Sequence, residues 1–143
     1  MGSYQDMMPL MSARDELIAT ATKWLSLWNT PVDWVLFDSI HSDAFEDCAS
    51  GGRQTTKQGF AQGLEQLARA FPDLRTMLQS LVVDEQSSTV AVRWSGRGTN
   101  VERFLGIGPT NRTIEMTGIE IIQISRGQVV RRWGEWDLSA HHA

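Results

Sequence analysis

Three carboxylates in the C-terminal part of the chain are candidates for acid/base catalysis: Glu120, Glu135 and Asp137. Apolar residues surround Glu120 in the sequence, and burial among them would disfavour its charged form and raise its pKa. A raised pKa is what a general acid or base needs near neutral pH. The alternatives are a structural ion pair of Glu120 with Arg93 or Arg132, and exposed or interface strand ends for the other two carboxylates.

The turn around Gly127 decides which side chains share a face of the predicted sheet with Glu120. If Ser125 to Gly127 form a three-residue loop, Ile124 faces Gln128 across the hairpin. That register puts Glu120 on one face with Arg132, Gly134 and Trp136. If only Arg126 and Gly127 form the turn, the same face instead collects Arg131, Trp133, Glu135 and Asp137. The sequence leaves both registers open.

Helices are predicted to fill the first half of the chain. Residues 13–28 carry apolar side chains at three- and four-residue spacing, which is typical of one face of an amphipathic helix. Pro31 ends this helix and suits the first turn of a second helix over residues 32–40. A third helix is predicted to begin at a cap formed by Thr55 or Thr56 and to end before Pro72. Between the second and third helices, residues 44–48 are predicted to form a short strand.

The second half of the chain has the composition of β-strands. Four segments, 74–83, 89–99, 112–124 and 129–138, are rich in Val, Ile, Thr and Trp and are separated by polar or Gly-containing breaks. Helices followed by antiparallel strands indicate an α+β fold and not the alternating order of a parallel βαβ fold. We expect one domain over residues 1–143, with residues 1–12 as a loosely ordered N-terminal segment.

Charge and composition argue against several classes of protein. The formal charge of −4, from 13 basic and 17 acidic residues, disfavours general nucleic-acid binding, which depends on clustered Lys and Arg. Apolar runs are too short for a membrane span, and Met1 to Met11 lacks the pattern of a signal peptide, so we expect a cytoplasmic protein without a membrane partner. Cys48 is the only cysteine and there are three histidines, so we expect no internal disulfide and no metal site.

Five segments, taken together in their order and spacing, resemble the SnoaL-like polyketide cyclase and ester cyclase family. They are AFPDL at 70–74, VAVRW at 90–94, FLGIGPTNR at 104–112, TGIE at 117–120 and the stretch 127–137. The resemblance implies the cone-shaped fold of nuclear transport factor 2, in which a curved, mostly antiparallel sheet and three helices from the N-terminal half enclose a pocket. It also implies homodimers or higher homo-oligomers formed through the outer sheet face. The characterised cyclases close a polyketide ring by an aldol reaction without cofactor or metal.

The catalytic pair of the cyclases does not carry over to this chain. Their His and Asp lie on the last two strands, and counting seven residues to either side of Gly127 places them at Glu120 and Gly134. Glycine has no proton to transfer, so the aldol mechanism of the family cannot apply unchanged. Limonene epoxide hydrolase, a relative by fold, has an Arg and two Asp at positions that fall on Arg93, Ser95 and Gly134, which disfavours its chemistry as well.

The leading hypothesis is therefore a cofactor-independent enzyme of the SnoaL-like cyclase type, with Glu120 as general acid/base on an apolar cyclic or polyketide-like small molecule. Candidate substrate-binding residues are Trp28, Arg93, Trp94, Met116, Trp133 and Trp136. One alternative is a non-catalytic module of the same fold that binds a hydrophobic ligand, and another is epoxide hydrolase or isomerase activity on the same scaffold. A further alternative is an interaction domain that uses the outer sheet face, for which a fully packed pocket would be the sign.

Overall fold

Helices form in the first half of the chain where the apolar spacing predicts them. In the computed structural model, which describes residues 11–140, α1 spans Ala13–Leu25, the 3₁₀ helix η2 spans Ser26–Trp28, α2 spans Trp34–Ile40 and α3 spans Lys57–Ala70. The loosely ordered segment predicted at 1–12 falls almost wholly outside the described residues.

Side-chain caps set the starts of the three α-helices. Ser12, Asp33 and Thr56 each accept a hydrogen bond from the backbone N–H three residues later. Thr56 is one of the two caps predicted for the third helix. The second helix begins at Trp34 and not at residue 32, because the Asp33 carboxylate, and not the fixed φ of Pro31, supplies its N-terminal signal.

Within residues 11–140, five strands form one mixed sheet, and the α+β prediction is confirmed. The strands are β1 at His41–Asp47, β2 at Arg75–Asp84, β3 at Thr89–Thr99, β4 at Thr113–Ser125 and β5 at Gln128–Ala140. Their order in the sheet is β1-β5-β4-β3-β2, with β1 parallel to β5 and the other pairs antiparallel. The first strand starts earlier than the predicted residues 44–48, directly at the end of α2.

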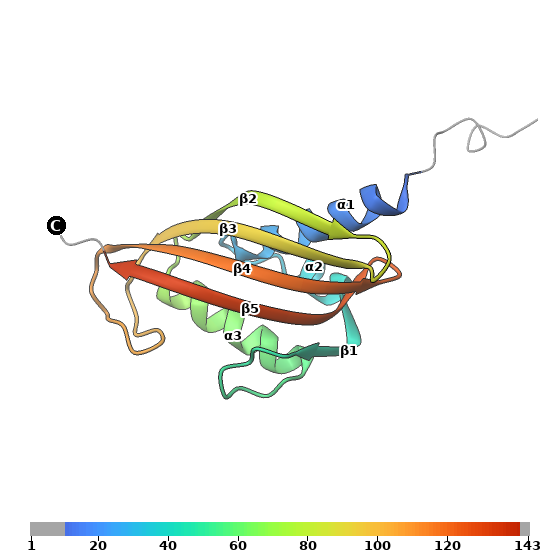
Figure 1. The fold of residues 1–143 in the computed structure, drawn as a ribbon. Coiled ribbons are helices and arrows are strands. Elements are labelled where there is room, and N and C mark those ends of the chain that lie inside the picture. Colours follow the sequence, from blue (N-terminus) through green and yellow to red (C-terminus); the bar gives the residue numbers. More distant parts are fainter. Residues whose placement is uncertain (1–10, 141–143) are drawn as a thin grey trace, which may run out of the picture.

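The sheet is curved, and the helices lie on one of its faces (Figure 1). Alternate residues of β3 and β4 point toward the helices and are buried, among them Trp94, Met116 and Ile122. From the helices, Trp24 and Leu67 pack into the same core. None of the helices within residues 11–140 combines the length and the apolar composition required to cross a membrane.

The hairpin between β4 and β5 combines features of both predicted registers. Arg126 and Gly127 alone form the turn, both with positive φ, so that Ser125 pairs with Gln128. An irregularity in the ladder follows, because Ile124 pairs with Val129 but the preceding residue, Gln123, pairs with Arg131. This β-bulge leaves one extra residue in β5. From that point on, the side chains of β5 point to the same faces as they would after a three-residue loop. Arg132, Gly134 and Trp136 therefore share the inner face with Glu120.

Candidate functional site

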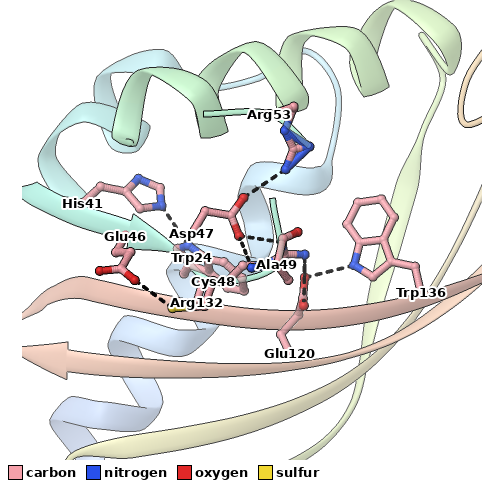
Figure 2. A network of polar contacts seen from close by, with 10 residues as sticks. All are labelled: Trp24, His41, Glu46, Asp47, Cys48, Ala49, Arg53, Glu120, Arg132 and Trp136. Atoms are coloured by element: carbon pink, nitrogen blue, oxygen red, sulfur yellow. Dashed lines mark hydrogen bonds and ion pairs between the residues drawn. The ribbon is translucent and has the colours of Figure 1, made fainter. Parts of the chain in front are cut away.

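Four charged side chains form a continuous network on the inner side of the sheet (Figure 2). Arg132 on β5 donates from Nη2 to both carboxylate oxygens of Glu120, at 2.9 and 3.2 Å, and from Nη1 to Oδ1 of Asp47 at 3.0 Å. Arg53 donates from Nη2 to the other oxygen of Asp47, Oδ2, at 2.9 Å. We call Asp47, Arg53, Glu120 and Arg132 the ion network. Its two carboxylate side chains are 0% and 1% exposed, so guanidinium groups take the place of water around them.

Strand pairing brings these four residues together. Asp47 ends β1 and is the parallel partner of Arg132, whose carbonyl accepts a hydrogen bond from the backbone N–H of Cys48 at 2.8 Å. Glu120 lies on the neighbouring strand β4. Arg53 comes from the loop 48–56, which leads from β1 into α3. The network thus joins the end of β1 and the loop after it to the β4–β5 hairpin, and Asp47 and Arg132 are 85 residues apart in sequence.

Burial changes the proton affinity of Glu120. Removal from water raises the pKa of its carboxyl above the usual range, against the opposing effects of the Arg132 charge and of hydrogen bonds from Arg132 and Trp136. The Trp136 indole donates from Nε1 to Oε1 of Glu120 at 3.0 Å. Burial alone would lower the pKa of Arg132, but Glu120 and Asp47 raise it, so this guanidinium remains charged.

Gly134 provides the space that the Glu120 carboxylate occupies. The two residues are direct partners across β4 and β5. A Cβ atom on Gly134 would lie 1.8 Å from Oε2 of Glu120 and 2.3 Å from Nη2 of Arg132. Any other residue at this position would therefore push the ion pair apart. The Glu120 carboxylate fits at this position because residue 134 has no side chain.

A cavity of about 640 Å³ lies beside the ion network. It is bounded by α3, by the loop 48–56 and by the segment between β3 and β4. Its apolar wall consists of Trp28, Phe60, Leu64, Leu67, Phe104 and Trp136. Its charged lining consists of Arg53, Arg69, Glu102, Arg103 and Arg132, and Gly134 contributes backbone. Figure 2 shows Trp136 and Arg132 on the two sides of Glu120, and both of these residues line the cavity.

The structure brings only part of the sequence-predicted set to this cavity. Trp28 and Trp136 line it, while Trp94 and Met116 are 2% and 1% exposed and belong to the core beneath it. The Trp94 ring meets the Trp136 ring edge to face at 5.1 Å between centroids, so it supports a wall residue without lining the cavity itself.

Strand parity turns the remaining candidates to the other face of the sheet. Arg93, Trp133, Glu135 and Asp137 are exposed on the outer face, because successive side chains of a strand point to opposite sides. Arg93 contacts Ser80 on β2, with 3.3 Å between Nε and Oγ. None of these four residues lines the cavity, so we leave them out of the proposed site.

From the sequence, Asp47 is expected only as a polar residue of the short strand near the pocket mouth, and Arg53 is not expected at the site at all. No periodic pattern marks either residue, because the contact depends on parallel pairing between β1 and β5, some 85 residues apart in the chain. The one available signal was an acidic residue at the end of a short predicted strand, followed by a loop with an arginine. Arg132 was identified as a possible ion-pair partner of Glu120, and the structure selects it over Arg93.

His41 is a second buried polar residue, and its environment differs from that of the ion network. Its Nδ1 lies 2.8 Å from the carbonyl oxygen of Phe37, and its Nε2 accepts a hydrogen bond from Nε1 of Trp24 at 2.9 Å. Burial lowers its pKa to about 4, so the ring is neutral at pH 7. Among residues 11–140, no group of three His, Cys, Asp or Glu side chains is arranged to hold a metal ion.

Comparison with protein families gives one match that covers most of the chain. The sequence profile of the SnoaL-like polyketide cyclases matches residues 18–143. No functionally curated protein matches the chain significantly.

Solved structures of similar fold include several from bacteria. TsrD from Streptomyces laurentii has a TM-score of 0.75 at 22% identity, over 90% of this chain and 92% of that one. IdmH from Streptomyces antibioticus has a TM-score of 0.71 at 22% identity, over 85% and 91% of the two chains. A SnoaL-like polyketide cyclase from Agrobacterium tumefaciens has a TM-score of 0.66 at 21% identity, over 90% and 93%. At these identities the likeness shows the fold.

Proposed function

Because the chain belongs to the SnoaL-like polyketide cyclase family, we propose that it is a cofactor-independent enzyme in which Glu120 transfers a proton on a mostly apolar, cyclic or polyketide-like small molecule. The observation that carries this proposal is the placement of the Glu120 carboxylate. It is buried, its pKa is raised, and it lies over Gly134, which lines the cavity and puts no side chain between the two.

Glu120 can serve both directions of the transfer. As a carboxylate it would accept a proton from a carbon beside a carbonyl group, and the electron pair of the broken C–H bond would move to the carbonyl oxygen. The enolate would then attack a second carbonyl carbon of the same molecule, and the alkoxide so formed would take the proton back from Glu120. One residue would thus replace the His and Asp pair that the resemblance to the family implies.

Arg132 is placed to stabilise the negative charge that develops on oxygen. Its guanidinium lines the cavity, carries a positive charge and is held in place by two carboxylates. A cation fixed in a water-poor site stabilises an enolate without reorganising during the reaction. The Trp136 indole, which donates to Glu120 at 3.0 Å, would hold the carboxylate in its position over Gly134, a residue that lines the cavity.

The test is the turnover of Glu120→Gln compared with that of a matched variant. Purified protein is incubated with ring-forming polyketide or ketosteroid-like substrates, and product is measured above the uncatalysed rate. We expect Glu120→Gln to lose at least about 100-fold in kcat, the usual contribution of a positioned acid or base. Glu135→Gln, which removes an exposed carboxylate from the outer face, should keep the activity of the parent protein. Full activity in Glu120→Gln would contradict the proposal.

A non-catalytic binding module of the same fold is the second candidate, and one observation favours it. The carboxylate of Glu120 receives donors from both Arg132 and Trp136 and is only 1% exposed, which is also how a purely structural ion pair is built. Such a protein would bind the same molecules in the cavity but would form no product. An interaction domain with a filled interior is disfavoured because a cavity of about 640 Å³ is present.

We further propose that copies of the chain associate through the outer face of the sheet, as the family resemblance implies. Ile119, Ile121 and Trp133 lie on adjacent strands of this face and are 54%, 41% and 41% exposed. Light scattering coupled to size exclusion would test it: Trp133→Glu should shift a homo-oligomer toward the monomer mass. A monomeric parent protein would refute the association.

A further inference from the structure

The charged lining of the cavity is strongly basic, although the chain as a whole is acidic. Four arginines line the cavity, Arg53, Arg69, Arg103 and Arg132, against a single carboxylate, that of Glu102. The whole chain has 13 basic and 17 acidic residues. Positive charge is thus concentrated around this cavity, and a cleft lined by one sign of charge attracts ligands of the opposite sign.

The counter-ions of two of these arginines lie behind them and not at the cavity surface. Asp47 and Glu120 are buried, and neither lines the cavity. A ligand in the cavity therefore meets the guanidinium side of the ion network. The Nε atoms of Arg53 and Arg132 are also buried and have no hydrogen-bond acceptor within residues 11–140.

The other two arginines differ in their partners. Arg69 pairs with Glu65 one helical turn earlier, with 2.7 Å between Nη2 and Oε1. Arg103 is exposed and forms no ion pair or side-chain hydrogen bond with the described part of the chain. It lies next to Glu102 on the loop between β3 and β4, and both residues line the cavity. Arg103 is the lining cation with its full donor capacity available.

The apolar part of the lining would hold a large apolar group. Phe60, Leu64, Leu67 and Phe104 line the cavity from α3 and from the loop before β4, and Trp136 closes the wall from β5. A purely apolar ligand would leave the arginines without an anion, while a purely polar one would leave the aromatic wall in contact with water. The lining fits a molecule that has both parts.

We propose that the ligand of this cavity is an amphipathic organic acid, whose ionised acidic group lies against Arg103 and Arg53 while its apolar body lies along Phe60, Leu64 and Trp136. The guanidinium fork suits an anion with two or more oxygens and pairs with it through parallel hydrogen bonds. This inference deepens the proposed function, because it assigns a substrate class to the same cavity. It concerns binding alone and holds whether or not Glu120 transfers a proton.

Two fluorescent probes that differ only in charge provide the test. One is 8-anilinonaphthalene-1-sulfonate, and the other is N-phenyl-1-naphthylamine, which has the same aromatic body without the sulfonate. Their dissociation constants are measured by fluorescence titration for the parent protein and for Arg103→Gln, Arg103→Lys and Arg14→Gln. Arg14 is an exposed arginine in the first turn of α1 and does not line the cavity, so it controls for the change in overall charge.

We expect the parent protein to bind the sulfonate more tightly than the neutral probe. Arg103→Gln should weaken sulfonate binding by about fivefold to tenfold, the usual net loss for one hydrogen bond. The same change should leave the neutral probe within about twofold, and Arg103→Lys should restore part of the sulfonate affinity because it keeps the charge. Arg14→Gln should change neither constant.

Equal affinity of the parent protein for the two probes would overturn the inference, as would an unchanged sulfonate affinity in Arg103→Gln. Failure to bind either probe would overturn it too, because the cavity would then not accept an amphipathic molecule. Failure of the catalytic proposal would be seen separately: Glu120→Gln would retain turnover, whatever the charge preference of the cavity.

Discussion

The two ends of β1 carry two fully buried polar residues, and the protein accommodates them in different ways. His41 at the start of the strand and Asp47 at its end are each 0% exposed. Rings of Phe37, Phe45 and Phe60 surround the imidazole, at 4.3, 4.8 and 5.4 Å between centroids. Asp47, in contrast, is held between two arginines and lies beside a cavity.

The difference shows that burial of a polar group does not by itself mark a functional site. His41 is neutral and has a partner at each ring nitrogen, so it needs no counter-ion and has no further hydrogen bond to offer. The ion network carries full charges, and two of its members reach the cavity surface. A candidate site differs from a core residue such as His41 in that its charged groups, although paired inside the protein, also line a cavity.

Removal of the central cation should give the largest effect on stability. Arg132→Met would leave both Asp47 and Glu120 buried, and Glu120 would keep only the indole of Trp136 as a donor. We expect the free energy of unfolding to fall by about 3 to 5 kcal/mol, as is usual when one partner of a buried pair is removed. Urea denaturation followed by circular dichroism measures it.

The matched control is Arg93→Met on the outer face, where the arginine is exposed and its Nε lies 3.3 Å from Oγ of Ser80. It should change the free energy of unfolding by no more than about 0.5 kcal/mol. An equal fall in the free energy of unfolding in the two variants would mean that the buried ion pairs of Arg132 stabilise the fold no more than an exposed arginine does.

The contrast between the two ends of β1 can be sharpened by lowering the pH. The folded pKa of His41 is lowered from 6.5 to about 4, so the unfolded chain takes up a proton in this range while the folded chain does not. The stabilising contribution is complete above pH 6.5 and is lost as the pH falls toward 4, by about 3 kcal/mol in all. The NMR chemical shift of the His41 ring, followed with pH, tests the cause directly. A midpoint near 6.5 would show that the aromatic surroundings do not exclude the charged form.

A smaller effect is expected from a methyl group placed inside the network. In Gly134→Ala the added Cβ would displace the end of the flexible Glu120 side chain and weaken its contact with Arg132. We expect a loss of about 1 to 3 kcal/mol, typical of a disturbed buried ion pair. In a Glu120→Ala background the same change should cost less, because the carboxylate, one of the two groups that it displaces, is gone and only Arg132 has to shift. An equal cost in both backgrounds would mean that Gly134 is required for another reason.

The sequence was sufficient for the fold because each element carries its own periodic or capping signal. The apolar stripe of α1, the Thr56 cap of α3 and the β-branched composition of β3 and β4 are local properties, and all four elements form close to where they are predicted. The arrangement of these elements was predicted from the resemblance to the SnoaL-like cyclases, and the family match over residues 18–143 confirms that resemblance.

The site was less accessible from the sequence because its geometry depends on one irregularity. The bulge after the Arg126-Gly127 turn decides that Arg132 and Trp136 face the helices while Trp133, Glu135 and Asp137 face outward. No residue type in the sequence predicts a bulge at this position. Asp47 joins Arg132 only through the parallel pairing of β1 and β5, which is a long-range contact that no local pattern encodes.

Burial beside the cavity should tune the Glu120 carboxyl for proton transfer, and an NMR titration measures its pKa directly. The ¹³C shift of the Glu120 carboxyl carbon is followed with pH and is assigned by its loss in Glu120→Gln. We expect a midpoint above the ordinary Glu value of about 4.5. A midpoint at or below that value would mean that the contact with Arg132 outweighs burial, and that the Glu120 carboxyl is not tuned for proton transfer near neutral pH.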